Sequence, residues 1–453
     1  MKRQFIIVVV LLLSTLSCGA QAIITDSILT HTVKQNTKRY DGYKSFDTLF
    51  VKDKLIITTK REMRRDYLKL TKGVKEEVVF NGDTMDVKKG YQLVRKNNRD
   101  SIRSHKNVWG SILGGPAYTP EASLGLGGAA LLTFKFNPRD SIVNRSILPF
   151  GFLVSINKTF MLAGGSEFFF KQNRIQLNTE YGIRYEPDNY FGVGYDVIDK
   201  NYKSDSTTQY TRMQVQLKPI LSFRIADNIL LGPILDYTYY NLLDPNEFMK
   251  KDAYYNRFDS HYLSAGIGVN FRYDSRDNPS MPYEGVRLNI SSLIYGKYLG
   301  GTYNYTYSSL DYRQYQRMFK RRSVLAWTAR IDISTGNVPL TALPTFGSPT
   351  DLRGYAKGHY RDKTMGYAIT EYRHMFGSQE VYDARRPFVS RLGFVVWGGV
   401  GTIGNNVNDW DKFKWNYGFG FRYEVQPHNN FRLDVGKSPH GKWMVYMNMI
   451  EAF

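Results

Sequence analysis

Residues 412–425 read Lys-Phe-Lys-Trp-Asn-Tyr-Gly-Phe-Gly-Phe-Arg-Tyr-Glu-Val, and this stretch decides the fold. Apolar or aromatic side chains occupy every second position from Phe413 to Val425, and the positions between them are polar, charged or glycine. This period of two is that of a β-strand, whose successive side chains point to opposite faces. Soluble strands usually have about five or six residues, whereas a strand that crosses a bilayer needs roughly nine to eleven. The stretch therefore predicts a membrane-spanning strand.

The same alternation recurs from about residue 108 to the end of the chain. It is clearest in Ile267 to Tyr273, Val324 to Ile333 and Phe431 to Gly436. We place the strands at 123–136, 146–158, 159–171, 173–186, 189–197, 208–225, 228–241, 261–275, 285–298, 302–316, 321–334, 363–376, 387–401, 412–426, 429–437 and 441–453. Trp109 to Tyr118 is either a further strand or part of the first one. The pattern predicts an all-β fold, a transmembrane antiparallel β-barrel of about 16 strands over residues 108–453.

Composition agrees with a barrel that is apolar outside and wet inside. The chain has 34 Tyr, 27 Phe and 6 Trp, yet its mean hydropathy is only -0.40. No segment outside the N-terminal one approaches the roughly 18 consecutive apolar residues that a membrane helix needs. A closed barrel is then the structure by which this chain would cross a membrane.

The N-terminus has the pattern of a secretory signal peptide over residues 1–22. Lys2 and Arg3 precede an apolar run, and Ala20-Gln21-Ala22 is a well-formed cleavage site. The alternative is lipidation of Cys18, although Thr15 stands where a lipidation motif has leucine. Residues 23–107 are polar and basic, and we interpret them as a periplasmic leader or small N-terminal segment.

Charge points to anionic lipid rather than to nucleic acid. The chain has 61 basic and 41 acidic residues, and loss of Lys2 and Arg3 leaves 59 basic ones and a net charge of +18. Such a charge suits outer-membrane lipids and the phosphates of lipopolysaccharide. No nucleic-acid-binding motif is present in the sequence, so we expect no nucleic acid as a partner.

A first motif lies between two expected strands, in residues 273–285. Its two prolines end strand pairing, its aspartate and asparagine can cap a turn through their side chains, and its glycine permits a backbone angle that other residues avoid. The turn motif consists of Asp274, Arg276, Asp277, Asn278, Pro279, Pro282 and Gly285.

Two further motifs follow toward the C-terminus. The lumen-loop motif, in the long connection before the strand expected at 363–376, consists of Leu352, Arg353, Gly354 and Tyr355. The closing-strand motif consists of Gly418, Gly420, Arg422, Arg432, Asp434, Gly436 and the aromatic residue Phe453. By the alternation, all residues of the closing-strand motif except Phe453 face the lumen, where charges can pair and glycines make room for a loop.

In order and spacing, the three motifs resemble those of the BamA/TamA family, the bacterial surface antigen superfamily. The turn resembles its D-x-R-D-N-P and P-x-x-G pattern, the loop its [VL]-R-G-[FY], and the last strands its G-x-G-x-R and R-x-D-x-G ending. The resemblance covers about residues 108–453. It implies a barrel of the bacterial outer membrane with a lumen-inserted loop, whose arginine docks on acidic residues of the wall.

The chain departs from this family in two ways. Relatives carry an aspartate in an F-x-D-x-G strand, where this chain has Gly399. Because a guanidinium pairs well with a carboxylate in a lumen, the remaining partners for Arg353 are Glu371 and Asp434. Of the two we favour Glu371, which faces inward on its strand. The chain also lacks recognisable POTRA modules, the periplasmic units that receive substrates in relatives.

The resemblance implies a role in outer-membrane protein assembly, or in translocation of protein or lipid. Nascent outer-membrane proteins or other outer-membrane factors would be the partners. In relatives the first and last strands form a weak seam, because an unpaired edge can template another strand. Here the seam is expected between the strand near Ser123 and Lys442 to Phe453. The alternative is a passive pore or structural barrel without insertase activity, and a homodimer stays open.

An enzyme is the third class, and the sequence argues against it. The seven histidines stand outside any nucleophile motif, at positions 31, 105, 261, 359, 374, 428 and 440. Acidic residues are scattered through turns rather than spaced as metal ligands. We therefore expect no catalytic residues, cofactor or metal.

Overall fold

The computed structural model describes residues 48–51, 54–57, 77–80, 83–86, 108–119, 123–137, 142–201, 208–279, 281–319, 322–377, 388–426, 429–439, 443–448 and 451–453. The chain divides into two compact units, residues 1–107 and 108–453. The signal-peptide prediction lies outside the described residues. No helix among those residues is both long and apolar enough to span a membrane.

Within residues 1–107 the described part is a small antiparallel sheet. Its strand order is β2-β1-β3-β4. The bounds are β1 Thr48–Val51, β2 Lys54–Ile57, β3 Glu77–Phe80 and β4 Asp83–Asp86. The interpretation of residues 23–107 as a leader or small segment stays a prediction.

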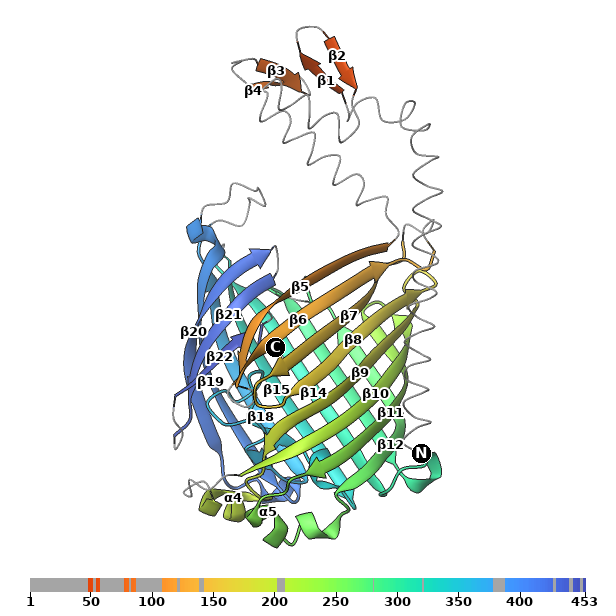
Figure 1. Ribbon diagram of the computed structural model, residues 1–453, viewed down its shortest axis with the longest axis vertical. Helices are drawn as coiled ribbons and strands as arrows, with labels where there is room; N and C mark the ends of the chain where they lie inside the picture. The colour runs from red at the N-terminus through yellow and green to blue at the C-terminus, as the bar shows by residue number, and fades with distance from the viewer. Residues whose placement is uncertain are drawn as a thin grey trace. The chain divides into compact units, whose positions relative to one another are not determined.

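Residues 108–453 form a 16-stranded antiparallel sheet that curls on itself, as Figure 1 shows. Its strands are β5 Val108–Thr119, β6 Ser123–Phe134, β7 Ser146–Ser155, β8 Phe160–Phe170, β9 Ile175–Asn189, β10 Gln209–Ala226, β11 Ile229–Leu243, β12 His261–Asp274, β13 Gly285–Tyr295, β14 Tyr305–Met318, β15 Ser323–Gly336, β18 Thr364–Met375, β19 Leu392–Gly404, β20 Lys414–Gln426, β21 Asn429–Lys437 and β22 Met444–Asn448. The predicted all-β antiparallel architecture and strand number are confirmed.

The alternation sorts side chains between the two faces of the sheet. On β20, Trp415, Tyr417 and Phe419 are exposed on the outside, while Asn416 and Arg422 are buried inside. Such a distribution would be unfavourable in water but is what a lipid-facing wall around a polar lumen requires. The apolar stripe read from residues 412–425 is therefore the outer surface of the barrel.

The two ends of the barrel differ in their connections. One end has the shortest connections, for example 227–228, and we call it the turn end. The other end has the three longest, 190–208, 244–260 and 337–363, the first two of which carry α4 (Tyr195–Asn201) and α5 (Glu247–Lys251), so we call it the loop end (Figure 1). In outer-membrane barrels short turns face the periplasm and long loops face outward.

Two strand predictions are corrected, and one alternative is settled. No separate strand forms at 189–197: β9 ends at Asn189, Gly192 and Gly194 adopt φ of +106° and +80°, which ends extended backbone, and α4 begins directly after them. Trp109 to Tyr118, left open in the sequence, belongs to a further strand, β5, which is the first of the sheet. The last strand is not 441–453 but β22, which has only five residues. The seam therefore lies between β5 and β22 rather than at a strand starting near Ser123.

Candidate functional site: the lumen loop and the closing strands

The connection 337–363 between β15 and β18 folds back into the lumen. Within it β16 (Thr345–Phe346) pairs with β17 (Tyr360–Arg361), which makes the loop a hairpin with its own hydrogen bonds. Leu352, Arg353 and Tyr355 are buried at its tip. Gly354 has φ +109° and lies against Lys437, so a side chain there would meet backbone atoms 2.6 Å away.

Arg353 is held by groups from four wall strands. Nη1 lies 2.6 Å from Oδ2 of Asp434 on β21, and Nη2 pairs with Oε1 of Glu371 on β18. The guanidinium carbon lies 3.7 Å from the ring centroid of Trp397 on β19, and the carbonyl of Arg353 accepts from Asn416 on β20. Sequence reasoning favoured Glu371 alone, whereas the structure brings both candidate acids to the arginine.

Asp434 and Glu371 also bind arginines of the wall itself. Asp434 accepts from Nη1 of Arg422 at 2.6 Å, and Arg432 Nη1 lies 3.3 Å from its second oxygen. Glu371 accepts from Nε of Arg373 at 2.8 Å. All five side chains are buried. Since a buried charge is costly unless it is paired, the loop arginine completes a network instead of standing alone.

Gly399, where the family resemblance led us to expect an aspartate, lies directly under the loop. A Cβ there would stand 2.9 Å from Cδ2 of Leu352 and 2.7 Å from Oδ1 of Asn416. The space for an acidic side chain is thus already filled by the loop. Glycine at 399 leaves room for Leu352 of the loop, and the arginine next to that leucine is held by Asp434 and Glu371 instead.

The glycines of the closing strands make room for specific neighbours. A Cβ at Gly436 would meet the carbonyl carbon and oxygen of Arg353 at 2.9 Å, so this glycine lets the loop approach the wall. A Cβ at Gly418 would meet the ring of Trp397 at 2.2 Å, and one at Gly420 would meet Asp434 Oδ1 at 2.1 Å. Of these three glycines, only Gly436 makes room for the loop itself.

The turn motif forms a compact connection between β12 and β13 at the turn end. Asp274 accepts from Nε and Nη2 of Arg276 at 2.9 and 2.7 Å, and Nη1 of the same arginine donates to the carbonyl of Pro279. One carboxylate and one guanidinium thereby fasten the end of β12 to the turn that follows it.

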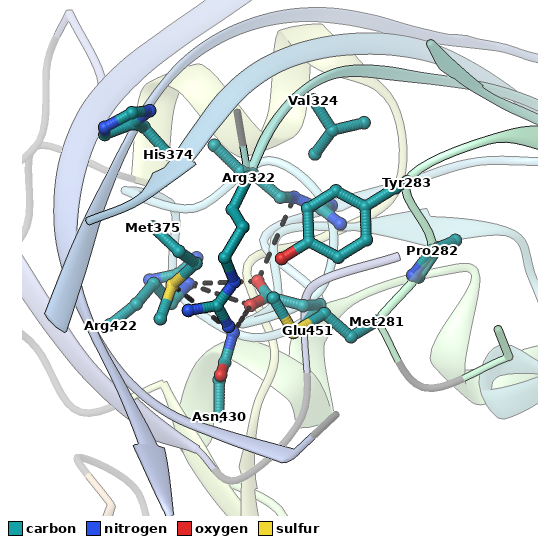
Figure 2. Close-up of a pocket in the computed structure, with 11 residues that line it drawn as sticks. Met281, Pro282, Tyr283, Arg322, Val324, His374, Met375, Arg422, Asn430 and Glu451 are labelled. Atoms are coloured by element: carbon teal, nitrogen blue, oxygen red, sulfur yellow. Dashed lines mark hydrogen bonds and ion pairs between the residues drawn. The ribbon is translucent and has the colours of Figure 1, made fainter. Parts of the chain in front are cut away.

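The second half of the motif caps the turn with side-chain oxygens. Asp277 Oδ1 accepts from the backbone N–H groups of Tyr283 and Glu284, and Asn278 Oδ1 accepts from that of Met281. Gly285 has φ +107°, and a Cβ there would stand 2.4 Å from the carbonyl oxygen of Ser275. Pro282, between these capped residues, lines a small pocket inside the barrel (Figure 2).

The segment Glu451–Phe453 lies inside the barrel. Glu451 accepts from Nε of Arg422 at 3.0 and 3.2 Å and from Nδ2 of Asn430 at 2.9 Å, as Figure 2 shows. Phe453 is buried below the guanidinium of Arg373. Burial by itself would raise the pKa of Glu451, but the charges of Arg422 and Arg373 and the bond from Asn430 outweigh it and lower that pKa to about 2. Phe453 therefore does not extend the outer apolar stripe.

Sequence reasoning missed two groups of contacts. Arg373, Trp397 and Asn416 contact the loop or the C-terminal segment, and only their inward parity on the strands could have singled them out. The replacement of the expected strand at 189–197 by α4 also adds a contact at the loop end, where Asp199 accepts from Tyr360 of the loop and from Lys414.

Comparisons with known proteins agree with this fold. A model of the Omp85 superfamily domain matches residues 149–439. The crystal structure of BamA from Haemophilus ducreyi lacking POTRA domains 1–3 is similar, with a TM-score of 0.52 and 14% identity over 86% of this chain and 80% of that one. CdiB from Escherichia coli has a TM-score of 0.46 and 10% identity over 76% of this chain and 61% of that one. A search of curated proteins finds no match.

Proposed function

Because the chain belongs to the Omp85 superfamily of bacterial outer-membrane barrels, we propose that it acts in outer-membrane protein assembly or in translocation of protein or lipid across that membrane. Omp85 proteins are insertases and transporters rather than enzymes. Nascent outer-membrane proteins are the proposed partners for assembly, and membrane lipid and lipopolysaccharide the proposed surroundings of the basic barrel.

The observation that carries this proposal is the weak seam. Each of the other neighbouring strands in the sheet pairs with the next, but among the described residues no pairing joins β5 to β22, although the two strands approach each other. β5 has 12 residues and β22 only five. Much of the edge of β5 is therefore open, and an open edge offers backbone groups to which an incoming strand can hydrogen-bond.

The alternative function, a passive pore or structural barrel, is less well supported. The loop 337–363 occupies the lumen and is tied to the wall through Arg353, so it narrows any water-filled path. A passive pore would give a steady large conductance in planar bilayers. We expect low, unsteady conductance from the wild-type protein.

Depletion in cells tests the proposal. After depletion, the outer-membrane levels of other barrels should fall, or a defined protein or lipid should fail to reach the cell surface. Wild-type protein supplied from a second copy should restore both, whereas Arg353→Ala, which loosens the loop, should restore them poorly. Unchanged barrel levels together with unchanged surface protein and lipid would contradict the proposal.

A further inference from the structure

A small pocket at the turn end of the lumen is lined in part by Glu451 of the protein's own C-terminal segment. We define the tail pocket by the five residues that surround Glu451 there, Tyr283, Arg373, Met375, Arg422 and Asn430. Figure 2 labels Tyr283, Met375, Arg422 and Asn430 around Glu451. These residues come from the turn after β12 and from β18, β20 and β21. Two arginines, an amide and apolar surface thus converge on one point of the wall.

We propose that the tail pocket is a binding site for an acidic peptide segment that carries an aromatic side chain two residues after its carboxylate. The protein's own Glu451–Phe453 occupies the site in cis and is exchangeable for a peptide of the same chemistry. The inference rests on the proposed function only for the physiological source of such a peptide, a polypeptide passing the seam.

The parity of β22 explains why this segment leaves the sheet. Asp434 pairs with Tyr446, which is buried, while Val445 and Met447 are exposed on the outer face. Continued with the same period, the strand would place Glu451 and Phe453 on the outer face too. A carboxylate on that face is unfavourable near lipid, whereas inside the barrel it meets Arg422.

The pocket is held in place without the segment. Arg422 is bound by Asp434 through Nη1 at 2.6 Å, and Arg373 by Glu371 through Nε at 2.8 Å. Each arginine therefore keeps one buried carboxylate of the wall when Glu451 leaves. A site whose charged groups are positioned by their own neighbours is preformed, and a ligand does not have to order it.

The segment is bound through groups that a free peptide also has, namely a carboxylate, a backbone carbonyl and an aromatic ring. Besides its bonds from Arg422 and Asn430, Glu451 lies 3.9 Å from Nε of Arg373. Nη2 of Arg373 donates to the carbonyl oxygen of Phe453, and its guanidinium lies 4.8 Å from the Phe453 ring centroid. Among the described residues, 451–453 form no strand pairing. Exchange would therefore break no sheet hydrogen bond.

Two guanidinium nitrogens of the pocket arginines could each donate a further hydrogen bond. Nη1 of Arg373 and Nη2 of Arg422 are buried and have no hydrogen-bond partner within the described part of the chain. Buried guanidinium N–H groups without acceptors are unfavourable, so a carboxylate that also accepted from these two groups would bind more strongly than Glu451 does.

Peptide binding to the purified full-length protein tests this inference. The probe is a fluorescein-labelled peptide with the sequence of Met449 to Phe453, and the readout is fluorescence anisotropy in detergent. Glu451→Gln weakens the cis segment but leaves the pocket unchanged, and loss of one charge-assisted contact should let this variant bind the probe about tenfold more tightly than wild type does. Glu247→Gln, on exposed α5, is the matched control and should bind like wild type.

Phe453→Ala provides a second variant that weakens the segment without a change of charge, and heat-modifiable mobility shows that each variant is folded. A probe with glutamine in place of its glutamate should bind Glu451→Gln at least about tenfold more weakly than the parent probe. The inference is overturned if both folded variants bind the probe no better than wild type, or if the glutamine probe binds equally well. Failure here leaves the depletion test of the proposed function unaffected.

Discussion

Arg353 and Asp434 are 81 residues apart in the sequence, yet Nη1 of the arginine lies 2.6 Å from Oδ2 of the aspartate inside the barrel. The contact joins the loop after the eleventh strand of the sheet to the fifteenth strand. Because Asp434 also binds Arg422, which in turn binds Glu451, the loop and the C-terminal segment belong to one network of buried charges.

Replacement of Arg353 by alanine should destabilise the barrel. The change leaves Asp434 and Glu371 with one fewer cation in a buried site, and breaking such a pair typically costs about 3 to 5 kcal/mol. We expect heat-modifiable mobility to change at a lower temperature and bilayer conductance to rise. Arg353→Lys should recover part of the stability. Mobility and conductance identical to wild type in Arg353→Ala would rule out a docked loop.

Replacement of Gly436 by alanine should displace the loop without removing any charge. The new Cβ would lie 2.9 Å from the carbonyl atoms of Arg353, closer than van der Waals contact allows. We expect conductance to rise as in Arg353→Ala. Gly165→Ala, on a strand position with no atom within 4 Å of the added Cβ, is the matched control. Equal conductance in the two alanine variants would contradict the close approach.

Alanine at Gly285 should destabilise the turn between β12 and β13. The residue adopts φ +107°, and a Cβ would also stand 2.4 Å from the carbonyl oxygen of Ser275. Gly300→Ala separates the two effects, since φ there is +83° but no atom lies within 4 Å. Backbone strain of this kind costs on the order of 1 to 3 kcal/mol. Denaturant unfolding should show a larger loss of unfolding free energy for Gly285→Ala than for Gly300→Ala. An equal or smaller loss would show that the contact with Ser275 does not destabilise the turn.

The ion pairs of Glu451 should make the free energy of unfolding depend on pH in the acidic range. Its pKa is about 2 in the folded protein and near the ordinary glutamate value when unfolded, so the unfolded state takes up the proton first as pH falls. The stabilisation is complete above about pH 4.5 and is lost toward pH 2. We expect the difference in free energy of unfolding between wild type and Glu451→Gln to be constant from pH 5 to 8 and to shrink below that range. A difference that persists at pH 2 would argue against ionised Glu451 in the pocket.

Much of the barrel could be predicted from local sequence. The alternation in residues 412–425 predicted which side chains of β20 face lipid, because the direction of a side chain on a strand depends on parity alone. The same rule failed at 189–197, where two glycines with positive φ interrupt the extended backbone before α4. An alternating composition is compatible with a strand but does not exclude a turn that glycine permits.

The candidate site was less predictable than the strands. The motifs located Arg353 and its two acidic candidates, and parity placed Glu371 and Asp434 on the lumen side. Their simultaneous contact with one guanidinium depends on how far the loop enters and how β18 and β21 are staggered around the barrel. The filled space beneath Gly399 depends on the same geometry.

By itself, the sequence determined most of the membrane-spanning strands, the side that side chains on them face and the motifs that resemble the family, because these follow from a period of two and from residues close in the chain. Only the tertiary structure decided that Arg353 has two acidic partners, that β5 and β22 are the end strands of the sheet, and that Glu451 turns inward to Arg422. Those outcomes depend on which distant groups are brought together when the sheet curls on itself. Buried charges are stable only beside a partner, so they adopt the positions in which they are paired.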